Sequence, residues 1–199
     1  MDAGSNYNTF IGRNVAAATL NDATHNIAIG DSAMNDITTA DNNVGIGSSA
    51  MLNMTTATQN VAIGRQAMGL GITTGGSNVA IGYNALTSSN GAQNTAVGAG
   101  SLYTNTTGTN NVALGKDAMY LSTTGSSNIA VGRSALGLNT TGASNTAVGH
   151  EALDANTTAS NNSAFGQGAL GANTTGADNT AVGRYALGGN TTADLNTAI

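Results

Sequence analysis

An asparagine recurs at a nearly fixed interval along the whole chain, and each copy opens a phrase like Asn-Thr-Ala-Val-Gly-Arg-Tyr-Ala-Leu at residues 179–187. The copies begin at Asn8, Asn26, Asn43, Asn60, Asn78, Asn94, Asn111, Asn128, Asn145, Asn162, Asn179 and Asn196. The interval is 17 residues, with three slips of one residue. Such a period is typical of a solenoid in which each repeat forms one coil. We therefore expect one repetitive domain over residues 1–199, rather than two globular domains.

The first five positions of each repeat predict a strand, counting the asparagine as position one. Position two is Thr, Val, Ile or Ser, position three is mostly Ala, position four is Val, Ile, Leu or Phe, and position five is Gly. Such alternation puts positions two and four on one face and positions three and five on the other. Frequent Gly and β-branched residues disfavour a helical repeat. The sequence therefore predicts an all-β fold, a parallel β-solenoid of about eleven 17-residue coils.

The interior of each coil is expected to hold small side chains. A coil of this length has a contour of at most roughly 56–60 Å, so we expect a lumen too narrow for large residues, lined by Ala and Gly. The predicted lumen residues are Ala62, Ala80, Ala113, Ala130, Ala147 and Ala181. Positions eight and nine are mostly Ala followed by Leu or Met, which indicates a second short strand or corner at a packed site of constant volume. The pattern leaves open whether that Leu or Met packs in the lumen or between chains.

The phrase Asn-Thr-Thr-Gly, complete at residues 105–108, 139–142 and 173–176, predicts a turn that closes the coil. In stacked coils these residues form ladders spaced about 4.7–4.9 Å apart. Asn stacked on Asn is expected to chain side-chain hydrogen bonds along the axis.

Position four predicts an apolar stripe roughly 50 Å long on the outside of the solenoid. Its residues are Ile29, Ile46, Ile63, Ile81, Val97, Leu114, Val131, Val148, Phe165 and Val182. Soluble monomers rarely leave such a stripe in water. We therefore predict self-association, and three stripes meeting on one axis would cover every apolar face of a homotrimer.

The composition argues against several classes of function. Five basic and ten acidic residues give a net charge of −5, which disfavours a nucleic-acid partner. No apolar run approaches the ~18 residues of a membrane span, so no membrane insertion is expected. The chain has no Cys, and its two histidines lie at different repeat positions without an acid or base partner in register. We predict no catalytic residue, no metal site, no cofactor and no enzymatic activity.

All five basic residues directly follow the position-five glycine; they are Arg13, Arg65, Lys116, Arg133 and Arg184. Other coils place Asp, Ser, Tyr, Ala, His or Gln there. We interpret position six as an exposed rim that keeps the rod soluble, and a ligand-contacting column is the alternative.

The repeat resembles the heads of trimeric YadA-like autotransporter adhesins, whose Ala-Ile-Gly phrase recurs at residues 60–64 and 78–82. It also resembles Asn-Thr-Ala-x-Gly arrays of phage tail fibres and bacterial surface proteins that precede an endosialidase-type chaperone domain. The resemblance implies left-handed β-rolls in a trimeric fibre, with positions two and four near the axis. It implies an extracellular fibre or adhesin segment on a virion or bacterial surface, as an attachment element or spacer, with a host-surface receptor or glycan as a partner.

This chain departs from those families in two respects. Its repeat is longer than that of the autotransporter heads, and no neck, stalk, membrane anchor or chaperone domain is recognisable in it. The last phrase stops at Asn196-Thr197-Ala198-Ile199, so we expect a part of a longer fibre or a unit that stacks end to end.

Two other functions fit the same pattern. A self-assembling extracellular filament would use the stacking of coil ends. An ice-binding solenoid would use the Thr pairs as a regular array, although adjacent residues of a strand point to opposite sides.

Overall fold

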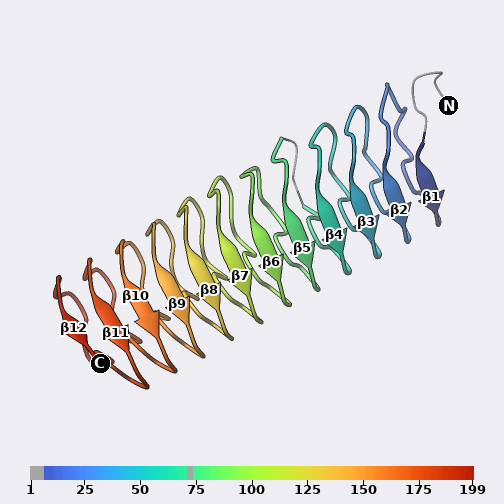
Figure 1. The fold of residues 1–199 in the computed structure, drawn as a ribbon. Helices are drawn as coiled ribbons and strands as arrows, with labels where there is room; N and C mark the ends of the chain where they lie inside the picture. The colour runs from blue at the N-terminus through green and yellow to red at the C-terminus, as the bar shows by residue number, and fades with distance from the viewer. Residues whose placement is uncertain (1–6, 71–73) are drawn as a thin grey trace.

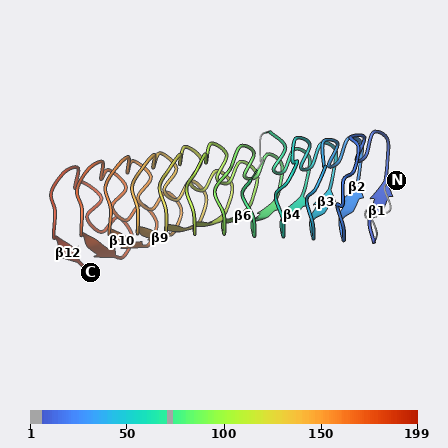
Figure 2. The same ribbon diagram turned by 90° about the horizontal axis from the view of Figure 1, so that it is seen from above.

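The computed structural model describes residues 7–70 and 74–199 and forms a rod of stacked coils (Figures 1 and 2). The first six residues of the predicted domain, and the first threonine of the pair at residues 73–74, lie outside these residues. The strands are β1 (Thr9–Ile11), β2 (Ile27–Ile29), β3 (Val44–Ile46), β4 (Val61–Ile63), β5 (Val79–Ile81), β6 (Thr95–Val97), β7 (Val112–Leu114), β8 (Ile129–Val131), β9 (Thr146–Val148), β10 (Ser163–Phe165), β11 (Thr180–Val182) and β12 (Thr197–Ala198). They form one parallel 12-stranded sheet in sequence order, and the described residues contain no helix. This confirms the predicted all-β parallel solenoid.

Repeat positions stay in register through the one-residue slips. In the sheet, Val61 pairs with Val79, and Val79 pairs with Thr95, although these coils have 18 and 16 residues. The slips are absorbed in the turn. In a 17-residue coil, the side-chain Nδ2 of the position-one asparagine donates to the backbone carbonyl 14 residues ahead, as in Asn94. In the 18-residue coil Asn60 donates to the carbonyl 15 residues ahead, and in the 16-residue coil Asn78 donates to the one 13 residues ahead.

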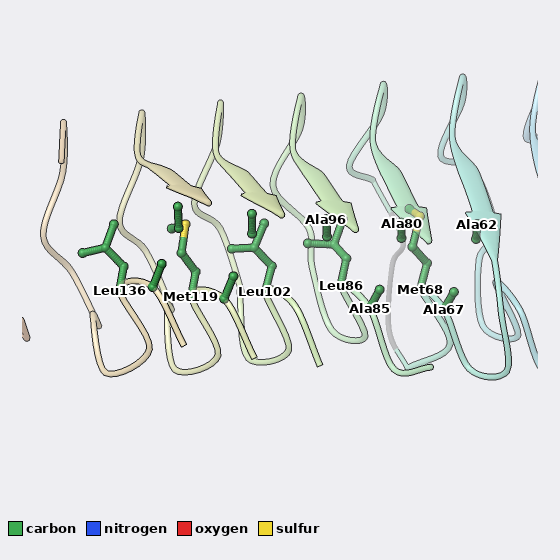
Figure 3. Close-up of a cluster of buried hydrophobic side chains, with 14 of the residues drawn as sticks. Ala62, Ala67, Met68, Ala80, Ala85, Leu86, Ala96, Leu102, Met119 and Leu136 are labelled. Carbon is green, nitrogen blue, oxygen red and sulfur yellow. The ribbon is translucent and has the colours of Figure 1, made fainter. Parts of the chain in front are cut away.

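The lumen holds the position-three Ala on one wall and a large apolar side chain on the other (Figure 3). All six alanines that we predicted to line the lumen are fully buried. The position-nine residues Met34, Met51, Met68, Leu86, Leu102, Met119, Leu136, Leu153 and Leu170 are also fully buried. The expectation that the lumen excludes large residues was therefore wrong. Small residues at positions three and eight leave room for one large side chain per coil.

Two coils depart from this arrangement at position three, one with a larger residue and one with a smaller one. The first coil places Phe10 at position three and Ala16 at position nine, so the large residue lies on the other wall. In the third coil Gly45 replaces Ala, and an added Cβ would lie 3.0 Å from Cε of Met34. At Gly45 the end of the Met34 side chain lies close to where a Cβ would be, as expected for a close-packed core.

The position-five glycines do not line the lumen as we expected; they are required where each strand turns into the next corner. Gly64 has a φ of +133°, and a Cβ there would lie 2.6 Å from the carbonyl oxygen of Gly82 in the next coil. Any larger residue would meet both a backbone clash and an unfavourable φ. The glycine column therefore allows the coils to stack closely at this edge.

Positions seven, nine and seventeen also adopt left-handed backbone conformations, although most of them are not glycine. Ser134 has a φ of +56°, Leu136 a φ of +52° and Ser144 a φ of +58°. A non-glycine residue in this region costs about 1 kcal/mol or more. Backbone pairing between coils offsets that cost: the Leu136 N–H donates to the Ala152 carbonyl at 3.0 Å. Position nine is thus a corner rather than a second strand.

A buried asparagine ladder runs through position one of the stacked coils. The Oδ1 of Asn128 accepts hydrogen bonds from both the backbone N–H and the Nδ2 of Asn145, at 2.9 and 3.2 Å. Nδ2 of Asn145 also donates to the Ala159 carbonyl at 2.9 Å, which ties the strand to the turn of its own coil. The predicted hydrogen bonds concerned the asparagines of the Asn-Thr-Thr-Gly turn, which form the ladder at position twelve. This ladder at position one was not predicted.

A second asparagine ladder runs through position twelve and is interrupted once. Nδ2 of Asn156 donates to Oδ1 of Asn139 at 2.9 Å, and the same bond joins Asn173 to Asn156 at 3.3 Å. Ser122 occupies this position in the coil between Asn105 and Asn139. In consequence, the buried Oδ1 of Asn105 and Oγ of Ser122 have no hydrogen-bond partner.

Replacing Asn128 by Ala tests the first ladder. The backbone N–H of buried Asn145 loses its acceptor, so we expect the free energy of unfolding to fall by about 1–3 kcal/mol in urea denaturation. The exposed Thr158→Ala control should change it by less than about 0.5 kcal/mol. Equal losses in the two variants would show that the ladder does not stabilise the fold.

Replacing Ser122 by Asn tests the second ladder by completing it. The new amide would donate to Oδ1 of Asn105 and accept from Asn139, so we expect about 1–3 kcal/mol of added stability and a higher melting temperature. Ser122→Ala removes the unpartnered hydroxyl without restoring the ladder and should change stability much less. A Ser122→Asn variant no more stable than Ser122→Ala would contradict this account.

Candidate functional site

The outer face of the sheet carries the residues predicted to form an oligomer interface. At position four, Ile63, Ile81, Leu114, Phe165 and Val182 are exposed, with exposed fractions of 37 to 42%. The other predicted residues of this column, Ile29, Ile46, Val97, Val131 and Val148, are half-buried within their own chain. Position three is buried between them in every strand from β2 to β11, so positions two and four share the outer face.

Position two widens this face over much of the rod. Ile27, Val44, Val61, Val79, Val112 and Ile129 are apolar, with Thr95 between them, whereas Thr146, Ser163 and Thr180 follow in the last coils. The two columns together form the outer stripe, roughly 50 Å long and 7 Å wide by strand geometry. Few water-soluble monomers expose a continuous apolar patch of this size.

The rim column at position six consists of residues that contact one another from coil to coil. Arg13 forms two hydrogen bonds with Asp31, at 2.9 and 3.1 Å, and Nε of Arg133 donates to Nε2 of His150 at 3.0 Å. Arg65 lies over the ring of Tyr83, 5.6 Å from its centroid. The hydrogen bond from Arg13 lowers the pKa of the Asp31 carboxyl. These exposed contacts contribute little stability, which fits a solvated rim.

The two histidines are engaged in separate surface contacts. His25 stacks on Tyr7 with ring centroids 5.0 Å apart, and His150 lies beside Arg133 and Glu151. Across residues 7–70 and 74–199, no group of three His, Asp or Glu residues could hold a metal ion. The same residues contain no helix that is long and apolar enough to cross a membrane.

In most coils the Thr pair exposes only its second threonine, whereas both members are exposed at Thr106–Thr107 and Thr191–Thr192. Oγ1 of Thr140, the first of its pair, donates to the Thr157 carbonyl at 2.9 Å, and Thr157 repeats this bond to Thr174. The second members, such as Thr141 and Thr158, are exposed. Over most of the rod, the threonine array at the surface is therefore one residue wide.

Sequence reasoning missed a groove on another side of the rod, at positions seven, ten and eleven. It is lined by Asp117, Tyr120, Leu121, Ser134, Gly137, Leu138 and Asp154 and has a volume of about 490 Å³. The available signal was the appearance of Tyr and Leu at positions ten and eleven in adjacent coils, where the coils from Asn162 onward have Gly or Ala.

Comparison with known proteins adds no functional assignment: no protein-family model, curated protein or solved structure matches the chain. Of the features on the surface, the outer stripe is the longest and most regular.

Proposed function

We propose that this chain is a rigid segment of an extracellular fibre on a virion or bacterial surface, which self-associates through the outer stripe and acts in attachment or as a spacer. The exposed apolar stripe is the observation that carries this proposal. Its ten position-four side chains are already at least half-buried, so covering the rest contributes about 6–12 kcal/mol per chain as an upper bound. That gain is of the same order as the cost of association, about 4–15 kcal/mol, and it is summed over every chain that joins the assembly.

A parallel trimer uses this stripe most completely. Each rod has one stripe, and cyclic symmetry brings the same stripe of every chain to a common axis. Three chains in the same direction keep identical repeat positions at the same height, so apolar position-two residues meet one another and the Thr and Ser residues of the last coils do the same. The resemblance of the repeat to trimeric adhesin heads and tail-fibre arrays also supports three chains and the extracellular setting.

The mass in solution is the first test. We expect light scattering after size exclusion to give three times the chain mass of 19.4 kDa, with early, rod-like elution. A mass that rises without limit as concentration increases would favour the self-assembling filament. A monomer at all concentrations would refute association through the outer stripe.

Charges placed on the stripe test which residues form the interface. Val131→Asp combined with Val148→Asp would bury two carboxylates on the axis, so we expect the trimer to separate into folded monomers. Thr141→Asp with Thr158→Asp adds the same charge to exposed residues of the same coils and should leave the mass unchanged. Circular dichroism must show folded protein in both variants, and a persisting trimer in the Val variant would place the interface elsewhere.

A further inference from the structure

The groove missed by sequence reasoning lies where a column of tyrosines stops. Tyr103 and Tyr120 occupy position ten of adjacent coils, and their rings stack with centroids 5.0 Å apart and an interplanar angle of 4°. The next coil has Gly137 at this position, which supplies no ring to continue the stack. Tyr103 covers one face of Tyr120, so the opposite face borders the groove.

Asp154 forms the far wall, in the coil after Gly137. Its carboxylate points toward Gly137 and occupies the space where a side chain would begin, since a Cβ built on Gly137 would lie 2.6 Å from Oδ1 of Asp154. Burial, and then the charge of Glu151, raise the pKa of this carboxyl. Asp154 makes no side-chain hydrogen bond to the residues that line the groove, whereas Asp117 is paired with Lys116 at 2.6 Å. The Asp154 carboxylate is therefore a hydrogen-bond acceptor that no side chain lining the groove occupies.

The spacing of the coils sets the size of the occupant. Tyr120 and Asp154 stand two coils apart, which is about 9.5 Å along the axis. Because the Asp154 carboxylate reaches back to Gly137, the room left over the face of Tyr120 is one coil high. One six-membered ring fills it, with its edge toward the carboxylate. Leu121 and Leu138 provide apolar contacts at the sides.

The chemistry of the walls selects the class of ring. The face of Tyr120 is electron-rich and attracts C–H groups that carry partial positive charge. The Asp154 carboxylate accepts hydrogen bonds from hydroxyls, and hydrogen bonds to a charged group are the stronger kind. The seven lining residues include two carboxylates and no Lys or Arg, so the walls offer no cation to a sulfated, phosphorylated or carboxylated ligand. A pyranose has an apolar C–H face and a rim of hydroxyl donors.

We propose that the groove between Tyr120 and Asp154 binds one neutral hexopyranose unit of a glycan. The apolar face of the sugar stacks on Tyr120, and its hydroxyls donate to Asp154. No residue of the outer stripe lines the groove, so this site does not depend on self-association of the chain.

Binding is tested on the intact protein by saturation-transfer NMR, with neutral gluco-, galacto- and manno-oligosaccharides as probes. Sialylated and sulfated oligosaccharides of the same length are the charged comparison. We expect at least one neutral series to bind in the millimolar range or tighter, and the charged series to bind about tenfold more weakly or not at all. Absence of binding by every neutral series, or tighter binding of the charged ones, would overturn the proposal.

Three variants locate the site. Tyr120→Ala removes the stacking surface, and Gly137→Tyr continues the tyrosine column into the groove, so each should weaken binding about tenfold or more. Tyr185→Ala removes an exposed tyrosine elsewhere and should leave it unchanged. Circular dichroism and light scattering check that the fold and mass of all three match the parent protein. Undiminished binding in Gly137→Tyr would show that the sugar binds outside this groove.

Discussion

The buried amide of the position-one asparagine fixes both the closure of each coil and its height relative to the next. Its oxygen accepts from the asparagine above, and its nitrogen donates to the turn of its own coil, as Asn145 does to Ala159. These atoms have no access to water, so a shift by one residue would leave several of them unpaired at about 1–3 kcal/mol each. That is why the three slips in the repeat appear in the turn and never between the asparagine and the strand.

Once the asparagine sets the register, the side chains of the coil divide by position. Position three faces inward, positions two and four face outward, and position nine fills the lumen. The glycine at position five lets the next coil approach, as the contact of Gly64 with the Gly82 carbonyl shows. The threonine that opens each pair adds a hydroxyl bond to the coil above. Each coil therefore makes its contacts almost entirely with its two neighbours, as in other repeat proteins.

The period, the strands, the asparagine ladder of the turn and an outward apolar column followed from the sequence because each depends on one residue type at one spacing. The place of Leu136 and its equivalents did not follow. Contour length limits the perimeter of a coil, whereas the room inside depends on the residues facing position nine. The small residues at positions three and eight leave room for one large side chain. The left-handed backbone at positions seven and nine was equally hidden, since Ser and Leu do not usually signal a positive φ. The groove exists because Gly137 has no side chain, whereas Tyr120 and Asp154 in the coils on either side have one. Such a difference between three successive coils cannot be seen in any one repeat.

The departures from the repeat therefore carry different information from the repeat itself. At position twelve, buried Ile37 and Met54 give way to asparagines further along the chain, which replaces apolar packing by a hydrogen-bond ladder in the same scaffold. At position ten, Tyr103, Tyr120, Gly137 and Asp154 differ in size and charge while the coils beneath them keep their register. A residue at such a position changes the surface without disturbing the lumen or the ladder. The outer stripe, by contrast, needs an apolar residue in every coil, because one buried charge would interrupt association along its length. The proposed self-association thus rests on the repeat itself, and the proposed sugar site rests on the few coils that differ from it.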